Sequence, residues 1–447
     1  MKNNIPLLTV FAGLSGMAAW SGSANGQGIV LEEVLVTAQK RSENIMEVPI
    51  SITALTADSL EKSNIGGMDD VQTAVSGIEF RRQVAAMAPF IRGIGSQNAT
   101  VIGFEPSVAL YIDGVYQSLP LNNGIGFKNI ERVEVLKGPQ GTLFGRNATG
   151  GAVNVITKNP QHDPSASIKL GYGNFDTSNA EFYGTTGITK TLAADLSIGY
   201  TDQKEGYGDN IILDEDVNKQ RAVTVRNKWI WEPSEQTTAT LSFSYDKTTE
   251  SPGSARAIAK GTMNQFGVPA LDDFYDTQEN FIEGIDTGNS HFDGHAAATE
   301  SKAATLRVDQ SFDAFSLVSI TGYIDQEAFI TVDNDSSNVS AVHAQLPYFN
   351  EQFSQEFQFI SNNEGPFNWI GGLYYMKAKQ KYDIFAVRAI PGFPVDRVEI
   401  DNSLDISSAA AFAEVGYDFT EQTELTLGLR WTKEEKELKG ITNACVT

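Results

Sequence analysis

The stretch Thr191-Leu192-Ala193-Ala194-Asp195-Leu196-Ser197-Ile198-Gly199-Tyr200-Thr201 decides the fold class of this chain of 447 residues. Its larger apolar side chains recur at every second position, and the positions between them are small or polar. A period of two is the repeat of a β-strand, whose successive side chains point to opposite faces. The stretch therefore predicts a half-buried antiparallel strand with one apolar face.

Ten further segments of the second half repeat this alternation, so we predict eleven strands in all. They cover residues 165–174, 177–187, 191–201, 221–231, 237–247, 302–312, 315–325, 351–361, 367–377, 407–419 and 423–432. After the first connection, short turns alternate with long loops, which we place at 202–220, 248–301, 326–350 and 378–406. Turns on one side, loops on the other and aromatic residues at strand ends are typical of an outer-membrane barrel. A soluble β-sandwich or β-propeller is the alternative, but it would not sort its connections by length so regularly.

Composition excludes several other classes of protein. The chain has 33 Lys and Arg against 56 Asp and Glu, a net charge of −23, so no basic nucleic-acid footprint covers it as a whole and we expect no nucleic-acid partner. A single cysteine excludes an internal disulfide framework and a zinc site built from several cysteines. The mean hydropathy of −0.21 argues against a bundle of membrane helices.

Residues 1–26 are predicted to be a secretory signal peptide. Lys2 supplies the positive start, an apolar stretch runs over 5–20, and the small residues Ser21, Ser23 and Ala24 follow it. The apolar stretch is too short to span a bilayer. A buried first helix is the alternative, but the amphipathic spacing that it needs is absent. We therefore expect the mature protein to leave the cytoplasm of a bacterium.

Four motifs stand in order between residues 31 and 158, namely 31–41, 91–95, 108–116 and 130–158. The last begins Ile130-Glu131-Arg132-Val133-Glu134-Val135-Leu136-Lys137-Gly138-Pro139 and continues through a glycine-rich part to Lys158. Its glycines lack the Lys-Ser/Thr pair of a phosphate-binding loop. Together the motifs resemble the TonB box and plug domain of TonB-dependent outer-membrane receptors.

The resemblance implies a membrane β-barrel with an N-terminal α+β plug domain. We expect the signal peptide at 1–26, a TonB-box-containing segment at 27–43, the plug at 44–160 and a partial transmembrane barrel at 161–447. Transporter barrels of this kind have about 22 strands, and an odd set of eleven cannot close a bacterial single-chain barrel. We therefore expect a C-terminally truncated chain that stops just inside a long outside loop, where Cys445 is one end of a possible disulfide bridge.

The segment that the resemblance assigns to TonB contact comprises Glu33, Val34, Leu35, Val36, Thr37 and Ala38. Its residues favour an extended strand, and no partner strand is obvious nearby. A free edge of this kind can add to the sheet of another protein through backbone hydrogen bonds. A disordered leader is the alternative. Further along, the sequence around Asp113-Gly114 predicts a tight hairpin between apolar arms.

Several charges stand between apolar runs and would be costly inside a barrel unless they were paired. The resemblance implies that arginines of the plug pair with glutamates of the inner wall, and each candidate glutamate lies in the middle of a predicted strand. Solvation by a water-filled lumen is the alternative. The candidates for charge pairing are Arg92, Glu131, Arg132, Glu134, Glu356 and Glu414, with Arg146 as a further charge of the plug.

No combination of residues predicts catalysis, and we expect neither a cofactor nor a metal site. His291 and His295 are four apart, but Gly294 interrupts them in an acidic loop. The resemblance implies an integral outer-membrane importer that is driven by TonB with ExbB and ExbD and is surrounded by lipid and lipopolysaccharide. We expect its ligand to be an iron chelate, a ferric siderophore. Haem, cobalamin and oligosaccharide uptake are alternatives, as is a fragment inactive in transport.

Overall fold

The computed structural model describes residues 34–41, 43–46, 48–83, 86–96, 102–103, 105–119, 129–210, 215–251, 255–256, 275–276, 297–333, 343–362, 365–388, 397–420 and 422–445. The predicted signal peptide, Glu33, His291 and His295 lie outside these residues. None of the described helices combines the length and hydropathy that crossing a bilayer requires.

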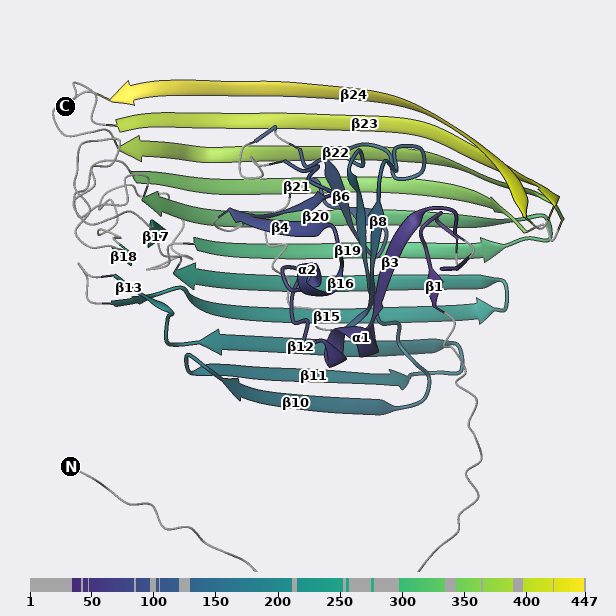
Figure 1. The fold of residues 1–447 in the computed structure, drawn as a ribbon, viewed down its shortest axis with the longest axis horizontal. Helices are drawn as coiled ribbons and strands as arrows, with labels where there is room; N and C mark the ends of the chain where they lie inside the picture. The colour runs from purple at the N-terminus through teal and green to yellow at the C-terminus, as the bar shows by residue number, and fades with distance from the viewer. Residues whose placement is uncertain are drawn as a thin grey trace, which may run out of the picture.

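A curved antiparallel sheet of eleven strands forms the wall of the molecule (Figure 1). Each strand of this sheet pairs with the next strand of the sheet along the chain. Short strands in two of the loops belong to a separate sheet. All eleven predicted strands are confirmed. They are β10 (Ser165–Gly173), β11 (Thr177–Gly187), β12 (Leu192–Gln203), β15 (Lys219–Ser234), β16 (Thr237–Ser251), β19 (Ala297–Ser311), β20 (Phe315–Asp333), β21 (His343–Ser361), β22 (Phe367–Arg388), β23 (Arg397–Thr420) and β24 (Thr423–Cys445).

The apolar faces of the strands point away from the interior of the wall. In β12, Leu196 and Ile198 are exposed while Asp195 and Ser197 are buried against the concave side. This arrangement reverses that of a soluble core and fits a wall that meets lipid outside and polar contents inside. The alternation that predicted the strands is therefore an outside-apolar, inside-polar pattern.

The strands β20 to β24 run much further than predicted. About 9–11 residues suffice to cross the hydrocarbon layer, whereas β22 has 22 residues and β24 has 23. In the added part of β22, Lys379 is exposed while its neighbours Ala378 and Gln380 are buried. Because this part of the wall carries charge on its outer face, the apolar alternation disappears although the strand continues.

This extension overturns three loop predictions. The predicted loops at 326–350 and 378–406 shrink to 334–342 and 389–396 between the bounding strands. Residues 433–445 are strand as well, so the prediction that the chain enters an outside loop after 432 is wrong. In the other two loops, short strands form a small four-stranded sheet of β13 (Gly208–Asn210), β14 (Glu215–Val217), β17 (Ala255–Arg256) and β18 (Tyr275–Asp276).

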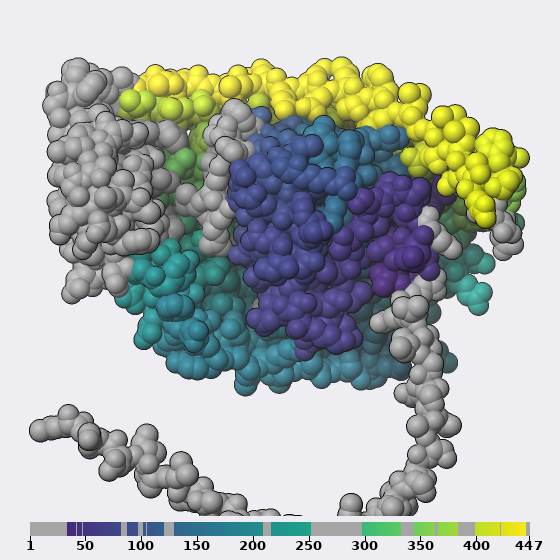
Figure 2. Space-filling view, viewed as in Figure 1, coloured from purple at the N-terminus to yellow at the C-terminus, as the bar shows by residue number. Residues whose placement is uncertain are grey.

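The N-terminal part folds as a compact α+β unit against the concave face of the wall, and we call it the plug. Its main sheet has the order β3-β8-β9-β6-β7 and pairs β6 with β9 in parallel. Figure 2 shows the plug, purple to blue, between the teal and yellow strands of the wall. Its elements are β3 (Ser51–Thr56), β4 (Ile78–Gln83), β5 (Ala86–Ile91), β6 (Val108–Ile112), β7 (Val115–Tyr116), β8 (Ile130–Lys137), β9 (Gly151–Thr157), α1 (Ala57–Lys62) and α2 (Val71–Ala74).

Local sequence explains the turns of the plug. Asp113 and Gly114 take left-handed φ values of 46° and 81° between β6 and β7, as the two central residues of a type I′ hairpin turn must. The predicted hairpin is confirmed. Thr56 begins α1, because its hydroxyl accepts a hydrogen bond from the backbone N–H of Ser59 at 3.3 Å. At Gly151, with φ of 144°, a side chain would collide with the backbone carbonyl of Leu136.

Candidate functional site

The predicted TonB-contact segment is folded against the plug. Leu35–Val36 form strand β1, which pairs antiparallel with β2 (Glu43–Asn44), and the backbone N–H of Ile45 donates to the carbonyl of Val34 at 3.0 Å. The strand is as predicted, but the expectation that it lacks a nearby partner is wrong. The partner is a two-residue polar strand, too short to give any periodic signal in the sequence.

Burial of alternate side chains holds the segment in place. Val36 and Ala38 are fully buried in an apolar cluster with Leu143 and Phe144 of the plug, while Leu35 stays half exposed. Burying an aliphatic side chain of this size is worth about 1.5–3 kcal/mol. The segment is therefore docked through its side chains as well as through its backbone.

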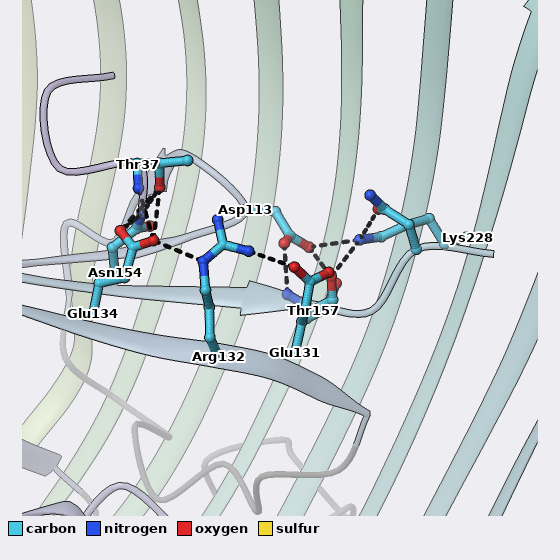
Figure 3. A network of polar contacts seen from close by, with 9 residues as sticks. Thr37, Asp113, Glu131, Arg132, Glu134, Asn154, Thr157 and Lys228 are labelled. Carbon is cyan, nitrogen blue, oxygen red and sulfur yellow. Dashed lines mark hydrogen bonds and ion pairs between the residues drawn. The ribbon is translucent and has the colours of Figure 1, made fainter. Parts of the chain in front are cut away.

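Thr37 is the polar anchor of the segment (Figure 3). Its backbone N–H donates to a carboxylate oxygen of Glu134 at 2.9 Å, and its hydroxyl lies 2.9 Å and 3.1 Å from the two carboxylate oxygens. Asn154 completes the group, because its amide donates to the Thr37 hydroxyl at 3.0 Å and to Glu134 at 3.2 Å. Since Glu134 is fully buried, these donors replace the water that its charge has lost.

Three more charged residues of the plug lie beside this group: Arg132 and Glu131 extend it, and Asp113 forms a second group. The Nε of Arg132 donates to Glu134 at 2.8 Å, and its guanidinium also pairs with Glu131. At the far end, the Asp113 carboxylate accepts from the backbone N–H of Thr157 at 2.9 Å and from its hydroxyl at 2.7 Å. These groups follow β8 and β9 along the face that the plug turns toward the wall (Figure 3).

Lys228 of β15 connects the wall to the Asp113 group. Its ammonium lies 3.6 Å from the Asp113 carboxylate and donates to the Thr157 carbonyl and the Asn159 side chain, each at 3.2 Å. The side chain is nearly buried. Three oxygen partners thus surround a cation that projects from the wall into the plug.

A second connection joins the end of the TonB-contact segment to β21. Lys40 forms an ion pair with Glu356, and its ammonium lies 5.7 Å from the ring centre of Phe144 and 5.2 Å from that of Phe412. Burial lowers the pKa of Lys40, against the opposing effect of the Glu356 charge. The charged form of Lys40 therefore depends on Glu356.

The structure corrects the partners predicted for the plug charges. Glu356 faces the plug as expected but pairs with Lys40, not with an arginine. Arg132 pairs within the plug, and Arg92 donates to the hydroxyl of Ser51 at 3.2 Å. Glu414 makes no ion pair within the part of the chain that the structure describes. Arg132 pairs within the plug because Glu131 and Glu134 stand beside it on the same strand, β8.

One plug arginine does reach a glutamate of the wall. Arg146 lies 3.3 Å from Glu434 of β24 and also pairs with Glu105 of the plug. Sequence reasoning placed residue 434 in a loop and therefore missed it. It also missed Lys40, Asn154 and Lys228, because the partners of these side chains lie up to 316 residues away in the chain. For Asp113, the sequence predicted a position in the hairpin turn but not the contact with Lys228.

The architecture of an outward-apolar strand wall around an α+β plug defines a class, the plugged receptors of the bacterial outer membrane. A family model of the TonB-dependent receptor plug domain matches residues 44–152. The pesticin receptor of Yersinia pestis is 30% identical over 164 residues, which are 36% of this chain and 24% of that protein. The vitamin B12 transporter BtuB of Vibrio vulnificus is 30% identical over 184 residues, 39% of this chain and 28% of that protein.

Solved structures agree on the fold. The ferric yersiniabactin uptake receptor FyuA of Yersinia pestis superposes with a TM-score of 0.70 at 19% identity, covering 88% of this chain and 61% of that chain. In sequence, the matched region spans about a quarter of the length of the pesticin receptor and of BtuB. The plug of this chain is therefore that of the TonB-dependent receptors, and its wall has the fold of these outer-membrane receptors.

Proposed function

We propose that the receptor containing this chain imports a scarce nutrient across the outer membrane, and that the nutrient is a ferric siderophore. The observation that carries the proposal is the docked segment Val34–Ala38, whose anchor Thr37 is bonded to the buried core of the plug. A segment held on the plug by a few specific hydrogen bonds can be released. Its strand β1 can then pair with the sheet of another protein.

In this proposal the protein drawn to that strand is TonB, working with ExbB and ExbD. The predicted contact residues Glu33 to Ala38 remain the proposed TonB site, with 27–43 as the segment that carries it, 44–160 as the plug and 161–447 as barrel. The exposed apolar face of the wall meets outer-membrane lipid and lipopolysaccharide. The activity proposed for the receptor is transport and includes no catalysis.

The choice of a ferric siderophore is supported by the structural likeness to FyuA, a ferric yersiniabactin uptake receptor. The likeness in sequence to BtuB, a vitamin B12 transporter, keeps cobalamin as the second candidate. Haem and oligosaccharides are further alternatives. Growth of a strain lacking this receptor separates these ligands, since only the imported one restores growth when the receptor is supplied again.

The TonB step is tested by Val36→Pro in the complete receptor. Proline cannot donate a backbone hydrogen bond and is excluded from paired strand interiors. We expect uptake of the growth-restoring ligand to be lost, while Val36→Thr, which keeps the N–H and the branched shape, retains it. Heat-modifiable migration on a gel checks that the barrel is closed. Equal uptake by both variants would refute the proposal, and absence of a closed barrel would favour the inactive fragment.

A further inference from the structure

A cavity of about 340 Å³ lies between the docked segment and the inner face of β15, β16 and β19. Sites for small molecules have volumes of roughly 300–1,000 Å³, so this cavity is large enough to hold one. Its lining includes Thr37, Lys40 and Arg41, which belong to the predicted TonB-box-containing segment 27–43. On the wall it includes Thr238 and Asp309, close to the ends of β16 and β19. The cavity therefore lies at the end of the wall that carries the short turns.

Arg41 is the cation of this lining that pairs with no carboxylate of the described residues. Its guanidinium donates to the side chain of Asn368 at 3.2 Å, and its Nε is buried without a hydrogen bond within that part of the chain. An arginine side chain is not deprotonated in proteins, so the cavity offers a permanent positive charge. The other cations of the lining each have a carboxylate, namely Lys40 with Glu356, Arg132 with Glu131 and Glu134, Lys228 with Asp113, and Arg307 with Asp309.

A second buried atom of the lining needs the opposite kind of partner. The amide nitrogen of Asn154 donates to Thr37 and to Glu134, but its Oδ1 accepts no hydrogen bond from the residues that the structure describes. The Asn154 side chain is nearly buried, and buried polar groups almost always have a partner in protein or water. A molecule that satisfies both atoms must accept from Arg41 and donate to Asn154. A carboxylate and a hydroxyl on one small molecule meet both needs.

We propose that this cavity binds a small hydroxycarboxylate, and that the bound molecule holds the TonB-contact segment on the plug. Thr37, Lys40 and Arg41 leave the lining when the segment undocks, so the site is complete in the docked state alone. A ligand that binds one of two states favours that state. At a ligand concentration of ten times the Kd, the ratio of undocked to docked segment should therefore fall about 11-fold.

The consequence for the receptor is inhibition of the TonB step by a molecule from the periplasm. The inference rests on the proposed function here, because only a receptor that gives its segment to TonB is inhibited when the segment stays docked. The short turns of an outer-membrane barrel face the periplasm, and the cavity lies at that end of the wall. The bound molecule is thus an effector taken from the periplasm, distinct from the ligand that binds on the outside.

The test uses the complete purified receptor with L-malate as the hydroxycarboxylate. A spin label at the half-exposed position Leu35→Cys, in a Cys445→Ser background, reports the undocked segment as the mobile fraction of its electron paramagnetic resonance spectrum. Val36→Ala raises that fraction to a measurable level, because it weakens docking at a side chain outside the cavity lining. We expect malate to lower the ratio of mobile to immobile label along a saturable curve. Succinate, which lacks the hydroxyl, should need a concentration roughly 2- to 13-fold higher for the loss of one hydrogen bond.

Two variants remove the site and keep the Thr37 anchor. Arg41→Gln removes the positive charge, and Thr240→Phe fills the cavity from β16. In both, malate should leave the mobile fraction unchanged. Arg81→Gln is the matched control, because this arginine of the plug pairs with Glu79 and does not line the cavity, so the variant should respond as the unaltered site does. Sodium chloride at the same ionic strength should have no effect.

The outcomes decide the inference without TonB or any imported ligand. A mobile fraction that malate does not change would overturn it, and so would an equal response in Arg41→Gln or to sodium chloride, as expected of a cavity that holds only water. Equal potency of succinate and malate would overturn the role of the hydroxyl. Because import is not measured, a failure of the proposed function leaves these results unchanged. A failure here likewise leaves the growth test and the Val36→Pro test unaffected.

Discussion

Replacing Thr37 by valine should release the TonB-contact segment from the plug. Valine keeps the branched shape of threonine and the backbone N–H bond to Glu134, so the change removes only the hydroxyl. That hydroxyl donates to the Glu134 carboxylate at 2.9 Å and accepts from Asn154 at 3.0 Å. Since valine returns nothing to Glu134, one charge-assisted hydrogen bond is lost from a fully buried carboxylate.

The magnitude follows from that single bond. A hydrogen bond to a charged group contributes about 1.5–3 kcal/mol, and each 1.36 kcal/mol is a factor of ten in an equilibrium constant. The ratio of undocked to docked segment should therefore rise roughly 10- to 150-fold. The remaining bonds of Glu134 to Arg132 and to the Thr37 backbone stay in place, so the plug itself should remain folded.

The assay is electron paramagnetic resonance of a spin label at Leu35→Cys, a half-exposed position of β1, in a Cys445→Ser background. The mobile fraction of the spectrum reports the undocked segment. Thr149→Val is the matched control, because its hydroxyl makes one exposed bond of 3.3 Å to the carbonyl of Ser107. If Thr37→Val left the mobile fraction unchanged, or if Thr149→Val raised it equally, Glu134 would not be the anchor.

Three further changes test other parts of the structure. Lys40→Met should lower stability by about 3–5 kcal/mol because it leaves the buried Glu356 charge unpaired, and adding Glu356→Gln should restore much of the loss in thermal unfolding; an additive loss would contradict the pairing. Gly151→Ala should make the plug sensitive to limited proteolysis, since a Cβ collides with the neighbouring strand there, and resistance would contradict the strained contact. Leu241→Arg places a charge on the lipid-facing side of β16 and should cost about 2–4 kcal/mol, seen as less assembled protein in outer-membrane fractions, whereas Thr240→Arg on the opposite face should assemble; the reverse order would invert the assignment of faces.

The wall could be predicted because lipid outside and polar contents inside impose a strict alternation on each strand. Leu196 and Ile198 display it, and so every one of the strands was found. The prediction failed where the outer face carries charge, as at Lys379 of β22, because a charged outer face removes the hydropathy alternation from the sequence. Hydrogen-bonded pairing with neighbouring strands continues there regardless.

The site was less predictable because its contacts join distant parts of the chain. Local patterns identified β1 and the Asp113 turn, since a strand and a turn are determined by residues that are adjacent in the sequence. No local pattern links Lys40 to Glu356, or Asp113 to Lys228, because charge pairs depend on which strand of the wall lies opposite the plug. A buried polar residue within an apolar strand was the usable signal, and Asn154 between Val153 and Val155 carries it.

The Thr37 anchor and the contact between Asp113 and Lys228 are joined by one short strand, β9. Asn154 of β9 holds the hydroxyl of Thr37, and three positions later Thr157 holds Asp113, which faces Lys228. Three residues of strand span about 10 Å, so a pull on Thr37 would load β9 close to Thr157, the residue that holds Asp113. β9 pairs with β8 on one side, where Glu134 lies directly opposite Asn154. Force on the segment would therefore act first on the anchor and next on the end of β9, where Asp113 meets Lys228 of the wall.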